Sequence, residues 1–107
     1  MEAVSKGAKE MGGTTVGILP DRGKGNPYLD VAVRTGMGYG RNVILVESAD
    51  AVVAIGGGYG TLSEIAIALK AGKNVFGYFT WEIEGVVKCI TPEEAVLMAV
   101  AAARRSC

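Results

Sequence analysis

The stretch "AVVAIGGGYGTLSEIAIALKAGK", residues 51–73, decides the fold class of this chain. Its first five residues are apolar and predict a buried strand, and the three glycines at 56–58 end that strand. A helix is then predicted, with Gly72 as its C-terminal cap, because apolar residues recur with helical spacing at Leu62, Ile65, Ala66 and Leu69. The stretch therefore predicts a strand, a glycine-rich loop and a helix in direct succession.

The same alternation of strand and helix continues on both sides of this stretch. Before it, the patterns predict a helix over residues 2–11, a strand over residues 14–20 and a loop over residues 21–30. A second strand is predicted over residues 31–33 and a second helix over residues 41–49. After it, they predict two strands and a helix, over residues 74–79, 86–90 and 91–105. Thr91 is the expected N-cap of that last helix, with Glu94 completing a capping box. Such an order predicts one α/β domain over residues 1–107, a parallel sheet with helices on both faces.

Composition excludes several classes of function. Eleven basic and eleven acidic residues cancel, so the chain lacks the positive excess typical of a nucleic-acid surface, and we expect no nucleic-acid partner. No apolar run approaches the roughly 20 residues that a membrane-spanning helix needs, and no secretory leader is recognisable, so we expect no membrane partner. The chain has no histidine, which excludes Ser-His-Asp and Cys-His pairs and histidine-ligated metals, and no metal site is expected.

The two cysteines, Cys89 and Cys107, provide neither a disulfide framework nor a zinc site. Cys89 lies in an apolar segment and is predicted to be a buried, reduced thiol. This favours a cytoplasmic protein.

The glycine loop is the strongest candidate for a functional site. Glycines let a ligand approach the backbone closely, and the first turn of the following helix offers free N–H groups at the positive end of its dipole. Such a site suits a phosphate group. The candidate phosphate-binding residues are Gly57, Gly58, Tyr59, Gly60 and Thr61; the alternative is that the glycines only form a tight turn.

Two further residues have both a functional and a structural interpretation. Glu64 follows Thr61 at capping-box spacing, so it could simply bond back to the start of the helix. Arg41 opens the preceding predicted helix and could clamp a phosphate or lie in solvent as an ordinary surface cation. The loop matches neither a P-loop nor a complete dinucleotide fingerprint, because no lysine follows the glycines and Ser63 takes the place of the last glycine.

Together these residues resemble one superfamily, the Rossmann-like proteins that include the lonely-guy phosphoribohydrolases and the molybdenum cofactor carrier proteins. Their shared motif is P-G-G-x-G-T-x-x-E, which this chain matches at Gly57-Gly58-Tyr59-Gly60-Thr61 and Glu64, with Gly56 in place of the proline. The phosphoribohydrolases have an Arg-Lys pair upstream of this motif. Arg41 matches the arginine of that pair, and Asn42 stands in place of the lysine. The triple glycine and the segments "NPYLDVAV" and "ALKAGK" look more like the carrier-type branch.

The resemblance also implies that the chain lacks the beginning of the family's fold. Family members start with a strand, a helix and a second strand that ends in G-G-x-x-G-[VL]-M, and Met1 looks like the methionine of that motif. The resemblance therefore implies an N-terminally truncated Rossmann-like domain whose strand at 51–55 has lost a neighbour. We expect the isolated chain to self-associate or to be loosely packed. Because members of the superfamily commonly form dimers or larger assemblies, the resemblance also implies a homo-oligomer.

For function, the resemblance implies carrier-type binding of a small, nucleotide-like phosphorylated ligand, a nucleotide or a molybdopterin-type cofactor. The first alternative is a nucleoside 5′-monophosphate phosphoribohydrolase, in which Arg41 and Glu64 would be the catalytic residues. The second is an incomplete domain without ligand function. Gly56 and Asn42 depart from the enzyme pattern, which favours binding over catalysis.

Overall fold

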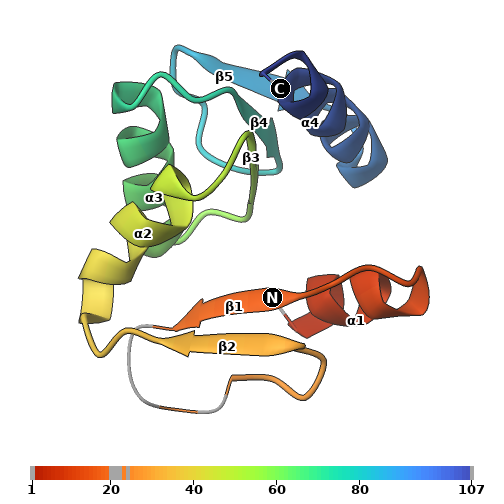
Figure 1. Cartoon of the computed structure of the whole chain (residues 1–107). Helices are drawn as coiled ribbons and strands as arrows, with labels where there is room; N and C mark the ends of the chain where they lie inside the picture. Colours follow the sequence, from red (N-terminus) through yellow and green to blue (C-terminus); the bar gives the residue numbers. More distant parts are fainter. Residues whose placement is uncertain (1, 20–22, 24, 107) are drawn as a thin grey trace. The chain divides into compact units, whose positions relative to one another are not determined.

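The computed structural model describes residues 2–19, 23 and 25–106, and its contacts divide the chain into two compact units, residues 1–41 and 42–107. Figure 1 follows the chain from the first unit, in red and orange, to the second, in green and blue. Each unit is described by itself. The predicted loop at 21–30 and the predicted end of the strand at 14–20 fall partly on residues 20–22 and 24, outside the described part, as does Cys107.

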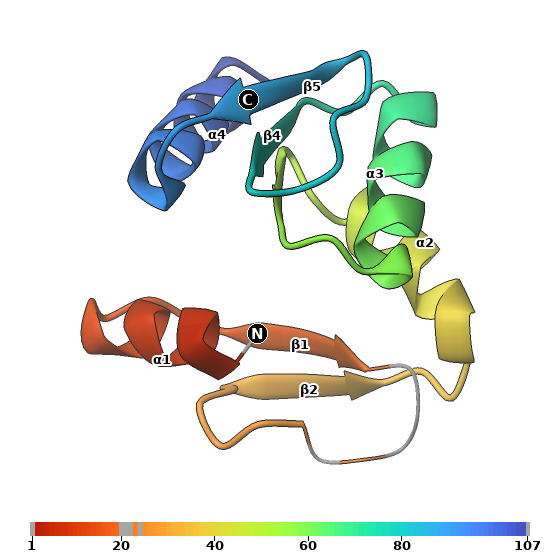
Figure 2. The same cartoon turned by 180° about the vertical axis from the view of Figure 1, so that it is seen from behind.

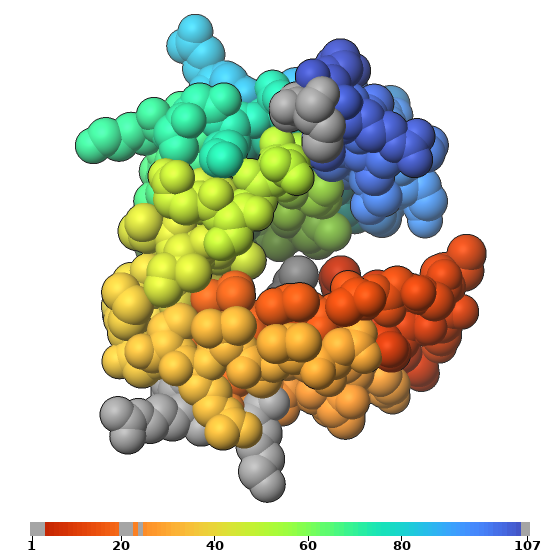
Figure 3. All heavy atoms as spheres, viewed as in Figure 1, coloured from red at the N-terminus to blue at the C-terminus, as the bar shows by residue number. Residues whose placement is uncertain are grey.

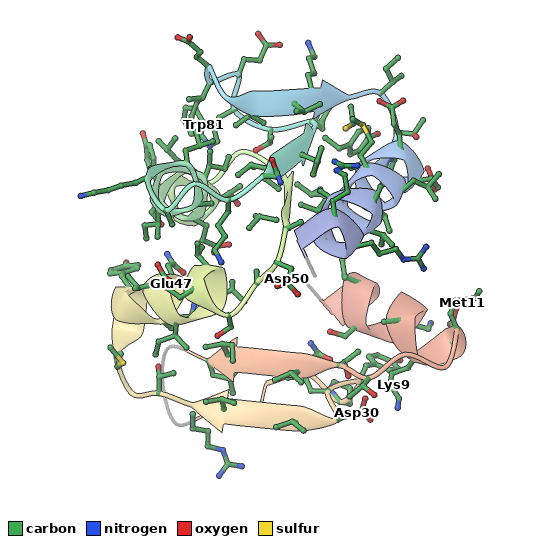
Figure 4. The ribbon with its side chains drawn as sticks, turned by 45° about the horizontal axis from the view of Figure 1, so that its top comes forward. Lys9, Met11, Asp30, Glu47, Asp50 and Trp81 are labelled. Atoms are coloured by element: carbon green, nitrogen blue, oxygen red, sulfur yellow. The ribbon has the colours of Figure 1, made fainter. Side chains whose placement is uncertain are left out.

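The first unit is a helix with a pair of parallel strands. It contains α1 (Glu2–Glu10), β1 (Val16–Leu19), β2 (Val31–Arg34) and the short 3-10 helix η1 (Gly38–Gly40). Asp30 joins these elements, because its carboxylate accepts a hydrogen bond from the Thr15 backbone N–H at 2.7 Å and lies 2.6 Å from the Lys9 ammonium. Figure 4 shows Lys9 and Asp30 beside each other.

The second unit contains a parallel three-stranded sheet in the order β3-β4-β5. Its elements are α2 (Arg41–Glu47), of which the first residue belongs to the first unit, β3 (Val52–Ile55), α3 (Tyr59–Lys70), β4 (Val75–Tyr78), β5 (Val86–Cys89) and α4 (Pro92–Ser106). Figure 2 shows α3 and α4 on opposite faces of this sheet. The carboxyl ends of the three strands therefore lie at one edge, the place where open parallel sheets bind ligands.

Each face of this sheet has its own core. On the α3 face the buried residues are Val46, Ala54, Ile65, Ala68 and Val75. On the α4 face they are Phe76, Cys89, Ala95, Ala99 and Ala102, and three alanines at helical spacing let α4 lie close to the strands. Cys89 is 3% exposed, as predicted, and burial raises the pKa of its thiol, with Glu94 adding to the effect.

The ends of α3 and α4 follow from their sequences. Gly72 has a left-handed backbone (φ 76°), and the N–H groups of Gly72 and Lys73 bond to the carbonyls of Leu69 and Ala68, which is the Schellman arrangement. Thr91 caps α4, because its hydroxyl accepts a hydrogen bond from the Glu94 N–H at 3.1 Å. The predicted stripe on α3 differs at one position: Ala66 is exposed and Ala68 is buried.

The α/β class with parallel strands is confirmed, but the described strands form two sheets rather than one. β1 pairs with β2, and β3 pairs with β4 alone. The physical reason is that no strand within the described ranges pairs with the outer edge of β3. None of the helices in those ranges is long and apolar enough to span a membrane.

Candidate functional site

The glycine loop connects β3 to α3 at the ligand-binding edge of the second unit's sheet. Gly56 follows β3 with a left-handed backbone (φ 90°), a conformation that favours glycine. Gly58 is extended (φ −71°, ψ 163°) and is the N-cap of α3, which begins at Tyr59. The chain thus turns from strand to helix within three residues.

The first turn of α3 offers backbone donors to a ligand. The first backbone bond of the helix runs from the Leu62 N–H to the Gly58 carbonyl at 3.0 Å. The N–H groups of Tyr59, Gly60 and Thr61 precede it and have no acceptor within the helix. A Cβ placed on Gly57, Gly58 or Gly60 would meet no atom within 4 Å, so the space beside the Cα atoms of these three glycines is open.

The capping-box interpretation of Glu64 is wrong. Thr61 would have to be the N-cap for Glu64 to bond back to it, but α3 begins two residues earlier and Gly58 is its N-cap. Thr61 is the third residue of the helix, and Glu64 lies in the second turn. The physical reason is that a glycine in extended conformation can start the helix without a side-chain cap.

Two residues of the β4–β5 loop hold the glycine loop, and sequence reasoning missed both. The Thr80 hydroxyl donates to the Gly56 carbonyl, and the Trp81 indole N–H donates to the Gly58 carbonyl at 3.2 Å. The Tyr59 ring, itself 82% exposed, stacks on Trp81 with the ring centroids 6.1 Å apart. The only available sequence signal was that Trp81, the single tryptophan, follows a strand end at the ligand-binding edge.

A second connection joins α2 to the start of α3. The Asn42 amide donates to the Ser63 hydroxyl at 2.7 Å, and that hydroxyl donates to the Gly60 carbonyl at 2.8 Å. Asn42 is 2% exposed, and its Oδ1 has no hydrogen-bond partner among the described residues. Asn42 therefore holds the helix that carries the glycine loop.

Arg41 and the glycine loop belong to different units of the chain. Arg41 is the last residue of the first unit, and the glycine loop lies in the second. The role of Arg41 in binding phosphate therefore stays a prediction. Within the described residues, no group of three His, Cys, Asp or Glu side chains is placed to hold a metal ion.

The fold and the loop define a Rossmann-like α/β protein with a glycine-rich strand-to-helix turn. The chain belongs to the SLOG cluster4 family, whose model matches residues 1–104. A relative from Archaeoglobus fulgidus is 53% identical over 98 residues, which make up 90% of this chain and 65% of the relative.

Solved structures show the same fold. The molybdenum cofactor binding protein of Rippkaea orientalis is 37% identical and superposes with a TM-score of 0.85, over 94% of this chain and 69% of that protein. The Moco carrier protein of Chlamydomonas reinhardtii is 32% identical with a TM-score of 0.83, over 100% of this chain and 72% of that protein. The resemblance to the superfamily of lonely-guy and molybdenum cofactor carrier proteins is thereby confirmed.

Proposed function

We propose that this chain binds a nucleotide-like phosphorylated ligand or cofactor at Gly57 to Thr61, without transforming it. One observation carries the proposal: the first N–H groups of α3 have no acceptor within the helix, and the glycines beside them, Gly57, Gly58 and Gly60, leave open space where a side chain would stand. Phosphate is the ligand group that such donors and the helix dipole favour. Similar proteins are named as binding or carrying the molybdenum cofactor, which supports a carrier role.

Asn42 supports binding over catalysis. It takes the position after Arg41, where the resemblance places the lysine of the phosphoribohydrolases, and it is neutral, buried and bonded to Ser63. A cation is therefore missing at that position. Incubating the protein with nucleoside 5′-monophosphates should release no free base, and accumulation of free base with time would favour the enzyme instead.

A pair of alanine variants tests the phosphate site. Gly60→Ala places a methyl group in the open space at the start of α3, where we expect it to obstruct the phosphate. Calorimetry with guanosine 5′-monophosphate should show an affinity at least about tenfold weaker than that of the parent, because hydrogen bonds to a charged group are lost.

Gly7→Ala in α1 is the matched control, since a Cβ there also meets nothing within 4 Å. Both changes replace a helical glycine by a better helix former, so neither should destabilise the fold. If Gly60→Ala binds the nucleotide as tightly as the parent and the control do, the glycine loop is not the phosphate site.

A further inference from the structure

The carbonyl of Gly56 is held from the loop that joins β4 to β5. Thr80 in this loop donates its hydroxyl hydrogen to that carbonyl. The peptide bonds between the described residues are trans, and in a trans peptide the N–H points away from the C=O of the same peptide group. The Gly57 N–H, which shares a peptide group with the Gly56 carbonyl, therefore points away from Thr80. It has no acceptor among the described residues, so a ligand on that side can use it.

The peptide group before the first residue of α3 is oriented in the same way. Trp81, which Figure 4 shows in the region of α3, donates its indole N–H to the Gly58 carbonyl at 3.2 Å, and the Leu62 N–H bonds to the same carbonyl at 3.0 Å. The Tyr59 N–H therefore also points away from the β4–β5 loop. The N–H groups of Gly57 and Tyr59 can thus donate to one anion on the far side of the glycine loop.

The peptide group between Gly56 and Gly57 depends most on being held. A glycine stands on each side of it, and without Cβ atoms both residues can change conformation at little steric cost, so the peptide plane can rotate. Half a turn would place the Gly56 carbonyl oxygen where the Gly57 N–H had been, and its partial negative charge would repel phosphate. The Gly58 carbonyl is fixed by the helix bond from Leu62 as well, whereas Thr80 is the one partner of the Gly56 carbonyl among the described residues.

The Thr80 side chain is itself fixed by packing. Gly77 is buried within β4, and a Cβ there would lie 2.7 Å from the Thr80 methyl carbon, too close for two such atoms. The Thr80 methyl group therefore occupies the place that a side chain at Gly77 would need. A glycine inside a strand weakens the strand and often marks the close approach of another group. With its methyl group packed on β4, Thr80 directs its hydroxyl to the Gly56 carbonyl at the end of β3.

We propose that Thr80 is a positioning residue of the phosphate site: its hydroxyl fixes the peptide group between Gly56 and Gly57 so that the Gly57 N–H faces the phosphate. Trp81 adds a second, weaker hold on the loop. The proposal rests on the proposed function, because it needs a phosphate at the glycine loop. It explains how glycines, which leave room for a ligand but are flexible, can present N–H groups in one direction. Donors that are already oriented bind more tightly, because less conformational freedom is lost on binding.

Thr80→Val tests the hydroxyl, since valine has the same branched shape and cannot donate a hydrogen bond. Calorimetry with guanosine 5′-monophosphate should show an affinity about tenfold weaker than that of the parent. Thr80→Ser keeps the hydroxyl and should restore most of the affinity. Trp81→Phe should cost less affinity than Thr80→Val, because the Leu62 N–H still holds the Gly58 carbonyl.

Thr35→Val is the matched control. The Thr35 hydroxyl donates to the Leu19 carbonyl at 2.6 Å in the first unit, so this change removes a bond of the same kind from outside the glycine loop. Thermal melts should show similar losses of stability for the two valine variants, but only Thr80→Val should lose affinity for the nucleotide.

Nuclear magnetic resonance of the nitrogen-labelled protein provides a readout that a loss of stability alone would not change. Inorganic phosphate should shift the amide resonance of Gly57 in the parent and in Thr35→Val, and should shift it less in Thr80→Val.

A Thr80→Val variant that binds the nucleotide as tightly as the parent would overturn the positioning role and leave the phosphate site standing. Equal losses of affinity for Thr80→Val and Thr80→Ser would show that the hydroxyl is not the cause and would also overturn it. If the parent binds neither the nucleotide nor inorganic phosphate, the proposed function fails together with the positioning role.

Discussion

At the residue scale, the glycines of the loop have two different roles. Gly56 is required by backbone conformation, since its φ is 90°. Gly57, Gly58 and Gly60 have no left-handed backbone, and a Cβ on any of them would meet nothing. Because these three glycines have no side chains, they leave open space that the chain's own atoms do not fill and that a ligand can occupy. This distinction explains why four glycines occur where a simple turn would need fewer.

Glu64 gives a prediction at the same scale. Since Gly58 rather than Thr61 is the N-cap, Glu64 has no capping role at the start of α3. We therefore expect Glu64→Gln to leave the melting temperature nearly unchanged and to weaken the binding of guanosine 5′-monophosphate about tenfold, because the superfamily's motif implies that this carboxylate faces the ligand. Calorimetry and a thermal melt measure the two effects.

Glu93→Gln on α4 provides the control for this change, since it removes a carboxylate from an exposed position outside the proposed site. A Glu64→Gln variant that melts several degrees lower and binds normally would show that the side chain serves stability instead.

At the scale of the elements, one carboxylate of the first unit, that of Asp30, contacts both Lys9 of α1 and Thr15, the residue before β1. Lys9 and then the Thr15 N–H lower the pKa of Asp30 below its usual value of 3.8, although the group is exposed. A group with a lowered folded-state pKa stabilises the fold above its unfolded pKa, and this contribution is lost as the pH falls through the folded value.

We therefore expect Asp30→Asn to be less stable than the parent at pH 7 and to approach the parent's stability as the pH falls through the lowered pKa of Asp30, below its usual 3.8. Urea unfolding followed by circular dichroism at several pH values measures the difference. Asp50→Asn, an exposed carboxylate just before β3, is the control and should show a smaller loss at pH 7. A difference between Asp30→Asn and the parent that is the same at every pH would contradict the ion pair.

At the scale of the whole molecule, β3 has the composition of an interior strand and the pairing of an edge strand. Helices contact both of its faces, and it contains neither proline nor charge, the usual protection of an edge. The Val52 N–H bonds to the Asn74 carbonyl of the β4 side at 2.9 Å. Backbone groups alternate in direction along a parallel ladder, so those of Val53 and Ile55 point away from β4.

This edge predicts association of the isolated chain. Unpaired N–H and C=O groups at an apolar edge favour pairing with another strand, so sedimentation should show species larger than a monomer, or a hydrophobic dye should bind a loosely packed state. The apolar surface of α4 adds to this tendency: Leu97 is 72% exposed, and the helix, drawn in blue, lies at the surface in Figure 3.

Val53→Pro tests the edge specifically, since it removes an N–H that the β4 pairing does not use. This variant should keep the parent's circular dichroism and associate less. A monodisperse parent monomer with cooperative unfolding and no dye binding would show that β3 needs no further partner.

The sequence by itself determined the elements and the position of the loop. Periodicity and caps are local signals, so the predicted helices and strands agree with the observed ones to within a few residues, and the cap at Gly72 and the N-cap at Thr91 were predictable from neighbours alone. The resemblance likewise rested on short motifs, the glycine motif with Glu64, the upstream Arg41 and segments such as "NPYLDVAV", and it led to the correct family.

Only the tertiary structure decided how the loop is held and where its helix begins. Thr80 and Trp81 reach Gly56 and Gly58 across more than twenty residues of sequence, and Asn42 reaches Ser63 across as many. These contacts depend on β4 lying parallel to β3 and on α2 packing beside α3, which no local pattern specifies. The division of the strands into two sheets could not be predicted from the sequence either. Strand pairing depends on segments that come together from distant parts of the chain.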